Sequence, residues 1–155
     1  MAITSAICNS FKQEILVEGH NFTGSTDQFK LALYSSNTAS LGKATTQWTV
    51  ASDPSATPTD TYEVSTDGTG YTSGGNDLTS TTPVVNGDSA CCLFATTTWG
   101  STASFTARGC LIYNETASDK SVCSINFGAD KTVTSGTFTI EFPAQTAGNA
   151  IIEIT

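Results

Sequence analysis

The stretch EVSTDGTGYTSGGNDLT, from Glu63 to Thr79, places four glycines among threonine, serine and aspartate. A phosphate-binding loop needs glycines followed by a helix whose first N–H groups point at the anion. The sequence that follows, NDLTSTTPVV, has no helical period, carries β-branched residues and soon reaches Pro83. The glycines are therefore predicted to supply positive φ angles in the turns and bulges of a β domain.

Alternating apolar residues predict the strands of this domain. Phe29 to Tyr34 reads as a half-buried strand, and ACCLFATTT (90–98) and FTARGCLIY (105–113) read as buried ones. Further strands are expected at 47–50, 62–64, 70–72, 122–127, 138–142 and 150–154, with an exposed loop over 51–61. Strands of this number, separated by turn signals, indicate an antiparallel β-sandwich, immunoglobulin-like or jelly-roll-like.

One short helix is predicted near the N-terminus. Ser10 and Gln13 form a capping-box pattern, Phe11, Ile15 and Leu16 share a face, and Gly19 closes the helix. Residues 1–10 are interpreted as an arm that orders on a neighbouring molecule, and residues 11–155 as a single domain. The fold class is thus mainly all-β with one N-terminal helix.

Composition limits the partners of the chain. Its 155 residues fit one domain, and the net charge of −8 argues against nucleic acid or an anionic membrane and favours a basic partner surface. No stretch approaches the roughly 20 apolar residues of a membrane span. The first residues lack the basic and apolar segments of a secretory signal, so synthesis in a cytoplasm is expected. The five cysteines are accordingly expected to be reduced and mostly buried.

Residues for catalysis or metal binding do not form a recognisable pattern. His20 is the only histidine, no cysteine–histidine cluster occurs, and the carboxylates are scattered, so we expect no enzyme activity, metal or cofactor. Arg108, the only arginine, lies in an apolar run and is expected to form a structural ion pair, with a partner contact as the alternative. Trp48 and Trp99 are candidate interaction residues, although tryptophans of this kind are more often core or interface anchors. Phe11 is a further candidate through the apolar face of the helix.

The order of several segments resembles a family of small virion structural proteins of tailed bacteriophages. The likeness runs from about residue 9 to residue 155 and rests on NSFKQEILVEGHNF, DQFKLALYSS, EVSTDGTGYTSGGNDLT, WGSTASFTARGCLIYNE, INFGADKTVTSGTFTIEFP and AIIEIT. Ser73 and Cys110 stand where alanine is expected, and neither changes the turn or the strand. The resemblance implies no catalytic residues.

The resemblance implies a structural role in a virion, and two locations fit it. The first is a capsid decoration (cement) protein on the outer capsid surface, made in the host cytoplasm, with the major capsid protein and itself, as a homotrimer, for partners. The second is a tail fibre, tail tip or adaptor domain that binds a host receptor through Trp48, Trp99 and the loop over 51–61. A small carbohydrate-active enzyme is the third hypothesis, and it requires two carboxylates at a defined spacing in a cleft.

Overall fold

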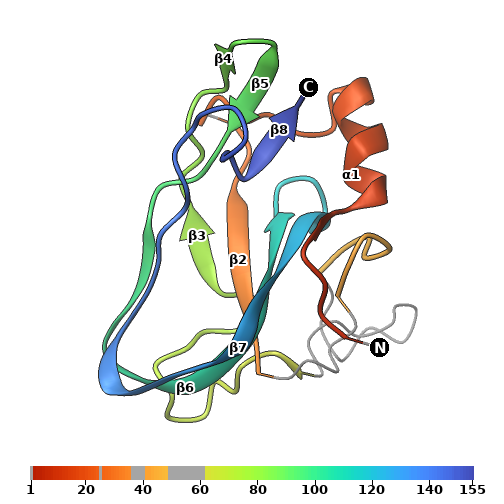
Figure 1. Cartoon of the computed structure of the whole chain (residues 1–155). Helices are drawn as coiled ribbons and strands as arrows, with labels where there is room; N and C mark the ends of the chain where they lie inside the picture. The colour runs from red at the N-terminus through yellow and green to blue at the C-terminus, as the bar shows by residue number, and fades with distance from the viewer. Residues whose placement is uncertain (1, 25, 36–40, 49–61) are drawn as a thin grey trace.

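The computed structural model describes residues 2–24, 26–35, 41–48 and 62–155. Its elements in chain order are β1 (Ala6–Ile7), α1 (Asn9–Glu14), the 3-10 turn η1 (Ile15–Val17), β2 (Phe29–Tyr34), β3 (Asn76–Leu78), β4 (Val84–Asn86), β5 (Ser89–Cys92), β6 (Thr97–Asn114), β7 (Lys120–Ile140) and β8 (Ile152–Ile154) (Figure 1). The paired strands are antiparallel throughout. This confirms the prediction of a mainly all-β protein with one short N-terminal helix and a sandwich-like fold.

The strands form two sheets of unequal size. The larger sheet has the order β1-β7-β6-β2-β3, and the smaller one the order β4-β5-β8. The small sheet lies at the end of the molecule where the C-terminus emerges, beside α1 (Figure 1). The loop predicted over 51–61 and the end of the strand predicted over 47–50 lie outside the described residues; Gln47 itself forms only an isolated bridge with Lys120.

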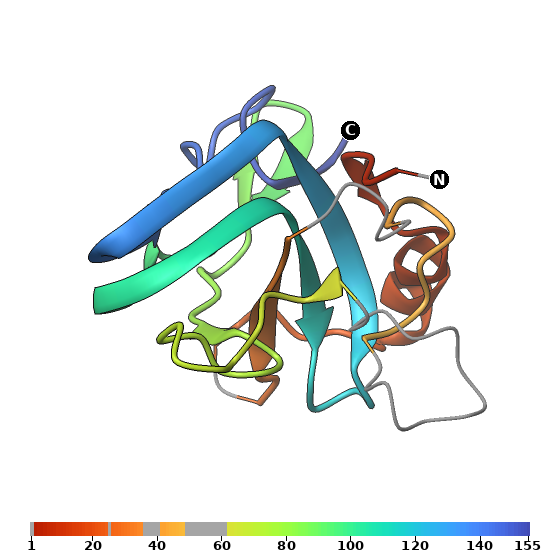
Figure 2. The ribbon, with the colours of Figure 1, turned by 90° about the horizontal axis from the view of Figure 1, so that it is seen from below.

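The single strand predicted over 90–98 was wrong: Ser89–Cys92 forms β5, and only Thr97 and Thr98 belong to β6. The strands β6 and β7 are long, and each joins segments that were predicted separately, 97–98 with 105–113 in β6 and 122–127 with 138–140 in β7. They run side by side as one ribbon, and both bend sharply midway (Figure 2). Their register shifts between Trp99 and Ala103, between Ala103 and Phe105, and between Ala107 and Gly109. Such bulges bend a ribbon and raise its twist without ending it. The prediction of separate strands was therefore wrong at these points, because the breaks in alternation mark bulges rather than turns.

The two faces of the large sheet bury separate apolar clusters. Phe29, Leu31 and Leu33 of β2 point into the larger cluster, where Phe11, Phe94 and Ile152 also lie. The alternate residues Ala32 and Tyr34 join Ile3, Leu41, Leu111 and Tyr113 on the other face, with Trp48 packed against them. A strand covered on both faces reads as a continuous apolar run, which explains the sequence FKLALY.

The glycine-rich stretch forms turns, as predicted. Gly68, Gly70, Gly74 and Gly75 all have positive φ angles. A Cβ on Gly75 would lie 1.7 Å from the carbonyl oxygen of Leu31, so only glycine fits where this turn crosses β2. Asn76–Leu78, rather than the predicted 70–72, then pairs with β2 as strand β3.

The helix differs from its prediction at both ends. It begins at Asn9 after the extended residue Cys8. Among the described residues, no side chain caps it, and the buried Ser10 hydroxyl has no hydrogen-bond partner. Glu18, not Gly19, takes the left-handed conformation, with φ 58°. Phe11 is buried as predicted, but Leu16 is 83% exposed, because the tighter η1 turn rotates it away from the core.

The N-terminal segment packs on its own domain. Ile3 is 1% exposed, and Ala6 and Ile7 pair with Ser124 and Cys123 of β7. The Cys8 N–H donates to the Val122 carbonyl at 3.0 Å. The described part of this segment is thus folded here, and its ordering on a neighbouring molecule stays a prediction.

Candidate functional site

Two of the candidate interaction residues lie in the interior. Phe11 is 2% exposed and packs against the His20 ring at a centroid distance of 4.9 Å. Trp99 is 3% exposed and contacts Tyr71, Phe105 and Phe138 edge-on or stacked. Both are core residues, so neither contributes its ring to a recognition surface in this conformation.

Trp48 is half-buried and belongs to a structural cluster around Glu63. Its ring stacks on Tyr113 at 5.3 Å, and its Nε1 donates to Glu63 Oε2 at 3.3 Å. The other oxygen of Glu63 accepts from the Tyr71 hydroxyl and from the Gly74 N–H, both at 2.6 Å. Burial and the Glu63 carboxylate raise the pKa of Tyr71, which keeps the phenol protonated as a donor. The glycine-rich turn is thus held from inside by one carboxylate.

Arg108 pairs across the β6–β7 ribbon. Its Nη1 lies 3.4 Å from Asp130 Oδ1, and its side chain is 24% exposed. Its Nε is buried and makes no hydrogen bond within the described residues. The geometry is that of a weak structural ion pair at the surface rather than a bidentate one.

The single histidine occupies the centre of a buried polar network. His20 Nε2 lies 2.9 Å from Glu14 Oε2, and its Nδ1 lies 3.1 Å from Asn114 Nδ2. Asn114 Nδ2 also donates to Asp27 at 2.6 Å, while its Oδ1 accepts from the Ala117 N–H. Because Nδ2 is a donor, His20 Nδ1 must accept, which assigns the neutral Nε2–H tautomer. The network ties α1, the turn before β2 and the end of β6 together.

The cysteines are buried and unpaired, as expected. Burial raises the pKa of Cys8 and Cys123 to about 12 and that of Cys92 to about 11. These thiols stay protonated near neutrality and are therefore poor nucleophiles and metal ligands. Within the described ranges, no three His, Cys, Asp or Glu side chains are grouped so that they could hold a metal ion.

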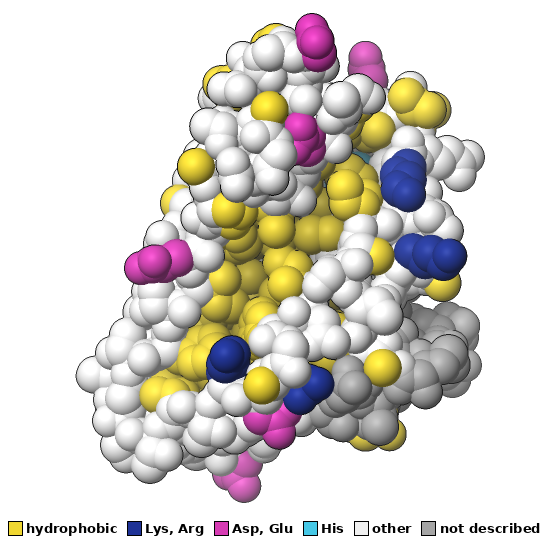
Figure 3. All heavy atoms as spheres, viewed as in Figure 1, with side chains coloured by type: hydrophobic (Ala, Val, Ile, Leu, Met, Phe, Trp, Pro, Cys, Tyr) yellow, Lys and Arg dark blue, Asp and Glu magenta, His cyan; other side chains and the backbone are white. Residues whose placement is uncertain are grey.

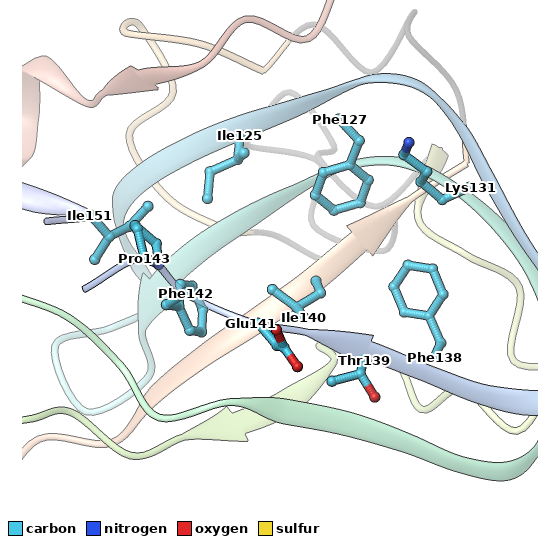
Figure 4. A pocket seen from close by; sticks show the side chains of 10 residues that line it. All are labelled: Ile125, Phe127, Lys131, Phe138, Thr139, Ile140, Glu141, Phe142, Pro143 and Ile151. Carbon is cyan, nitrogen blue, oxygen red and sulfur yellow. The ribbon is translucent and has the colours of Figure 1, made fainter. Parts of the chain in front are cut away.

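An apolar groove opens in the bend of β7. Its volume is about 470 Å³. Figure 3 shows it as a yellow hollow on the face of the molecule seen in Figure 1, and Figure 4 shows its side chains. The lining residues are Ile125, Phe127, Lys131, Phe138, Thr139, Ile140, Glu141, Phe142, Pro143 and Ile151. Six large apolar side chains and a proline make the lining mostly apolar, which suits an apolar group.

A second apolar surface lies on the small sheet. Val85, Ala90 and Ile154 are paired in register across β4, β5 and β8, and all three are exposed, Val85 by 80% and Ile154 by 52%. The next row on the same face, Cys92 and Ile152, is buried in the core. The core-facing side of this sheet therefore extends beyond the body of the domain and leaves an apolar row uncovered.

Sequence reasoning missed both apolar surfaces. The two turn residues Gly87 and Asp88, between VVN and SACC, are a hairpin signal that would have predicted β4 and β5. The alternating Phe138, Ile140 and Phe142 were expected to form a strand, but the groove depends on the bend that brings them opposite Phe127.

Comparisons with known proteins identify no relative: no protein-family model, curated protein or solved structure matches the chain. Among the described residues, no helix combines the length and apolar character needed to cross a bilayer.

Proposed function

We propose that this chain is a structural protein of a tailed-phage virion, a capsid decoration protein that binds the outer capsid surface and stabilises the head. The series of segments from NSFKQEILVEGHNF to AIIEIT supports the virion role by its resemblance to that family. The major capsid protein is the partner, and the chain acts as a homotrimer.

The exposed row of Val85, Ala90 and Ile154 is the observation that carries the binding role. These side chains are apolar and exposed to water, so binding of another surface that covers them is favourable. Asp88 follows Gly87 in the turn next to this row, and Glu153 lies on the opposite face of β8. Figure 3 shows acidic side chains, and no Lys or Arg, over the end formed by β4, β5 and β8. The surface that fits this end is apolar with a basic rim, and we assign it to the capsid.

The arrangement of the ionisable residues favours binding over catalysis. Both ring nitrogens of His20 are bonded to protein groups, and its side chain is fully buried. Glu63 is bonded by Trp48, Tyr71 and Gly74. Groups fixed in this way hold the fold and do not face a substrate, which supports a non-enzymatic role.

A binding experiment with capsids that lack the protein tests the proposal. The Val85→Asp and Ile154→Asp variants place a charge on the apolar row, and we expect each to weaken binding about 10- to 100-fold, as loss of a buried interface residue does. Ser101→Asp, an exposed position on β6, is the matched control and should bind normally. Equal binding by all three variants would contradict the assignment of this surface.

Cryo-electron microscopy of the particle tests the location. Many copies over the head, together with a loss of capsid stability when the protein is missing, are the expected results. Density on the tail or at a unique vertex would instead select the receptor-binding alternative.

A further inference from the structure

The groove in the bend of β7 has a counterpart on the same chain. Leu16 and Val17, in the η1 turn, are 83% and 72% exposed. Leu16 is the most exposed large apolar side chain of the described residues. We call these two residues, with the flanking Lys12 and Glu18, the apolar turn.

We propose that the groove of one molecule receives the apolar turn of a second copy, so that the chain assembles head to tail through this contact. The inference rests on the homotrimer included in the proposed function and names the surfaces that form it. Leu16 and Val17 enter the groove between Phe127 and Phe138, where their exposed surface leaves water. The charged residues beside these apolar groups favour a second copy over a basic capsid surface, as follows from their signs.

The charges of the two surfaces are complementary. The groove carries one cation, Lys131, and one anion, Glu141, and the apolar turn likewise carries Lys12 and Glu18. Within the described part of the chain, none of these four forms an ion pair. Docking of the turn pairs Glu18 with Lys131 and Lys12 with Glu141. A strongly basic partner would leave Lys131 opposed by like charge, which is why a second copy fits this groove better than the basic surface expected of the capsid.

The symmetry of the contact follows from its two different surfaces. Each molecule offers one groove and one turn, so the contact is heterologous, and a rotation that closes it gives a ring. A three-membered ring is the homotrimer of the proposed function. Both surfaces disappear from solvent in such a ring, while the row of Val85, Ala90 and Ile154 stays available for the capsid.

Sedimentation analysis of the purified protein over a range of concentrations tests the assembly. The wild-type chain should associate, and Leu16→Asp should weaken association at least about 30-fold, because a charge replaces a buried apolar side chain. This substitution is at an exposed position, so the variant should fold normally. Val85→Asp is the matched control and should associate like the wild type.

Charge reversal tests the pairing. Lys131→Glu and Glu18→Lys should each weaken association about tenfold, and the double variant, whose pair is restored with opposite signs, should recover most of it. Recovery supports the contact, because a general effect of charge would not be reversed by the second substitution. Additive losses would overturn it.

The outcomes separate this inference from the proposed function. A wild-type chain that stays monomeric at millimolar concentration, or that associates equally well as Leu16→Asp, overturns the inference. If Lys131→Glu weakens capsid binding in a monomeric protein, the groove belongs to the capsid contact and the second copy is excluded. Loss of capsid binding by Val85→Asp with unchanged self-association supports both proposals, whereas self-association without any capsid binding supports the inference and contradicts the function.

Discussion

The two halves of the β6–β7 ribbon belong to one hydrogen-bonded ladder, but they differ in burial and in whether β2 pairs with them. In the half next to the connecting turn, which we call the turn half, residues 109–114 of β6 are all buried, and β2 pairs with them along their whole length. In the other half, which we call the open half, residues 97–107 of β6 pair with residues 131–140 of β7 and have no β2 beside them. The exposed fraction along β7 changes accordingly, from buried Ser121–Ser124 to half-exposed and exposed residues beyond Gly128.

This difference places the most deeply buried part of the ribbon in one half and most of the proposed binding groove at the other. The turn half is covered by an apolar cluster on each face, and it holds the core together. The open half is bent, covers the core with one face, and lines the groove with Phe138 and Ile140. A substitution in the buried part of the turn half should therefore affect unfolding, and one on the groove-lining face of the open half should affect the proposed association.

The largest effect is expected from two matched glycine substitutions in β6. A Cβ on Gly109, in the turn half, would lie 2.5 Å from the Ile125 carbonyl oxygen and 3.0 Å from two carbons of Ile3. A Cβ on Gly100, in the open half, would have no atom within 4 Å. We expect Gly109→Ala to lower the free energy of unfolding by about 3 kcal/mol or more and Gly100→Ala to change it by less than about 0.5 kcal/mol. Urea denaturation measures both, and similar losses would contradict the comparison.

The second effect concerns the polar network at the end of the turn half. Asn114→Ala removes the amide that bonds His20 Nδ1 and Asp27, so the buried His20 Nδ1 loses this partner, while Asp27 keeps the Asn21 N–H. We expect a loss of about 2–3 kcal/mol in the free energy of unfolding. The His20→Ala, Asn114→Ala double variant should lose less than the sum of the single variants, because the two side chains stabilise each other. Strict additivity would show that the network does not act as a unit.

The features of this fold that the sequence could predict were those set by neighbouring residues, namely individual strands and the backbone conformation of glycines. Apolar patterns predicted β2, β8, the part of β6 over 105–113 and the two ends of β7, and positive φ was predicted correctly for the four glycines from Gly68 to Gly75. The continuity of β6 and β7 could not be predicted, because a bulge and a turn both interrupt the alternation. The groove could not be predicted either, since it forms only when the bend of β7 sets Phe127 opposite Phe138. Capping residues were also misleading at the helix, where packing of Phe11 and pairing of β1 determine the first turn.

A third and smaller effect is expected from the buried thiols at alkaline pH. Their folded-state pKa values, about 12 for Cys8 and Cys123 and about 11 for Cys92, are raised above those of unfolded thiols. The unfolded chain therefore loses protons first, and stability is fully present below about pH 8.5 and is lost as the pH rises toward the folded values. The slope is about 1.4 kcal/mol per pH unit for each thiol that ionises only on unfolding. Urea denaturation at several alkaline pH values measures it.

Cys123→Ala provides the control for this slope. It removes one thiol from the turn half, so the loss of stability with rising pH should be shallower than in the wild type, even if the variant is less stable at neutral pH. Tyr71, whose pKa burial also raises, contributes only where free phenols ionise, above about pH 10. An unchanged slope below that pH would exclude Cys123 as a contributor to it.

The smallest effect is expected from the ion pair of the ribbon, between Arg108 and Asp130. The Asp130 side chain is 62% exposed and the single contact is 3.4 Å long, so water screens the attraction. We expect Asp130→Asn to lower the free energy of unfolding by less than about 0.5 kcal/mol, and a rise in salt concentration to leave the difference from the wild type small. A loss above about 2 kcal/mol would mean that the partly buried guanidinium depends on this carboxylate, its one charge partner among the described residues. Arg108 would then stabilise the fold as the residues of the turn half do. The stabilising part of β6 would begin at Arg108 rather than at Gly109.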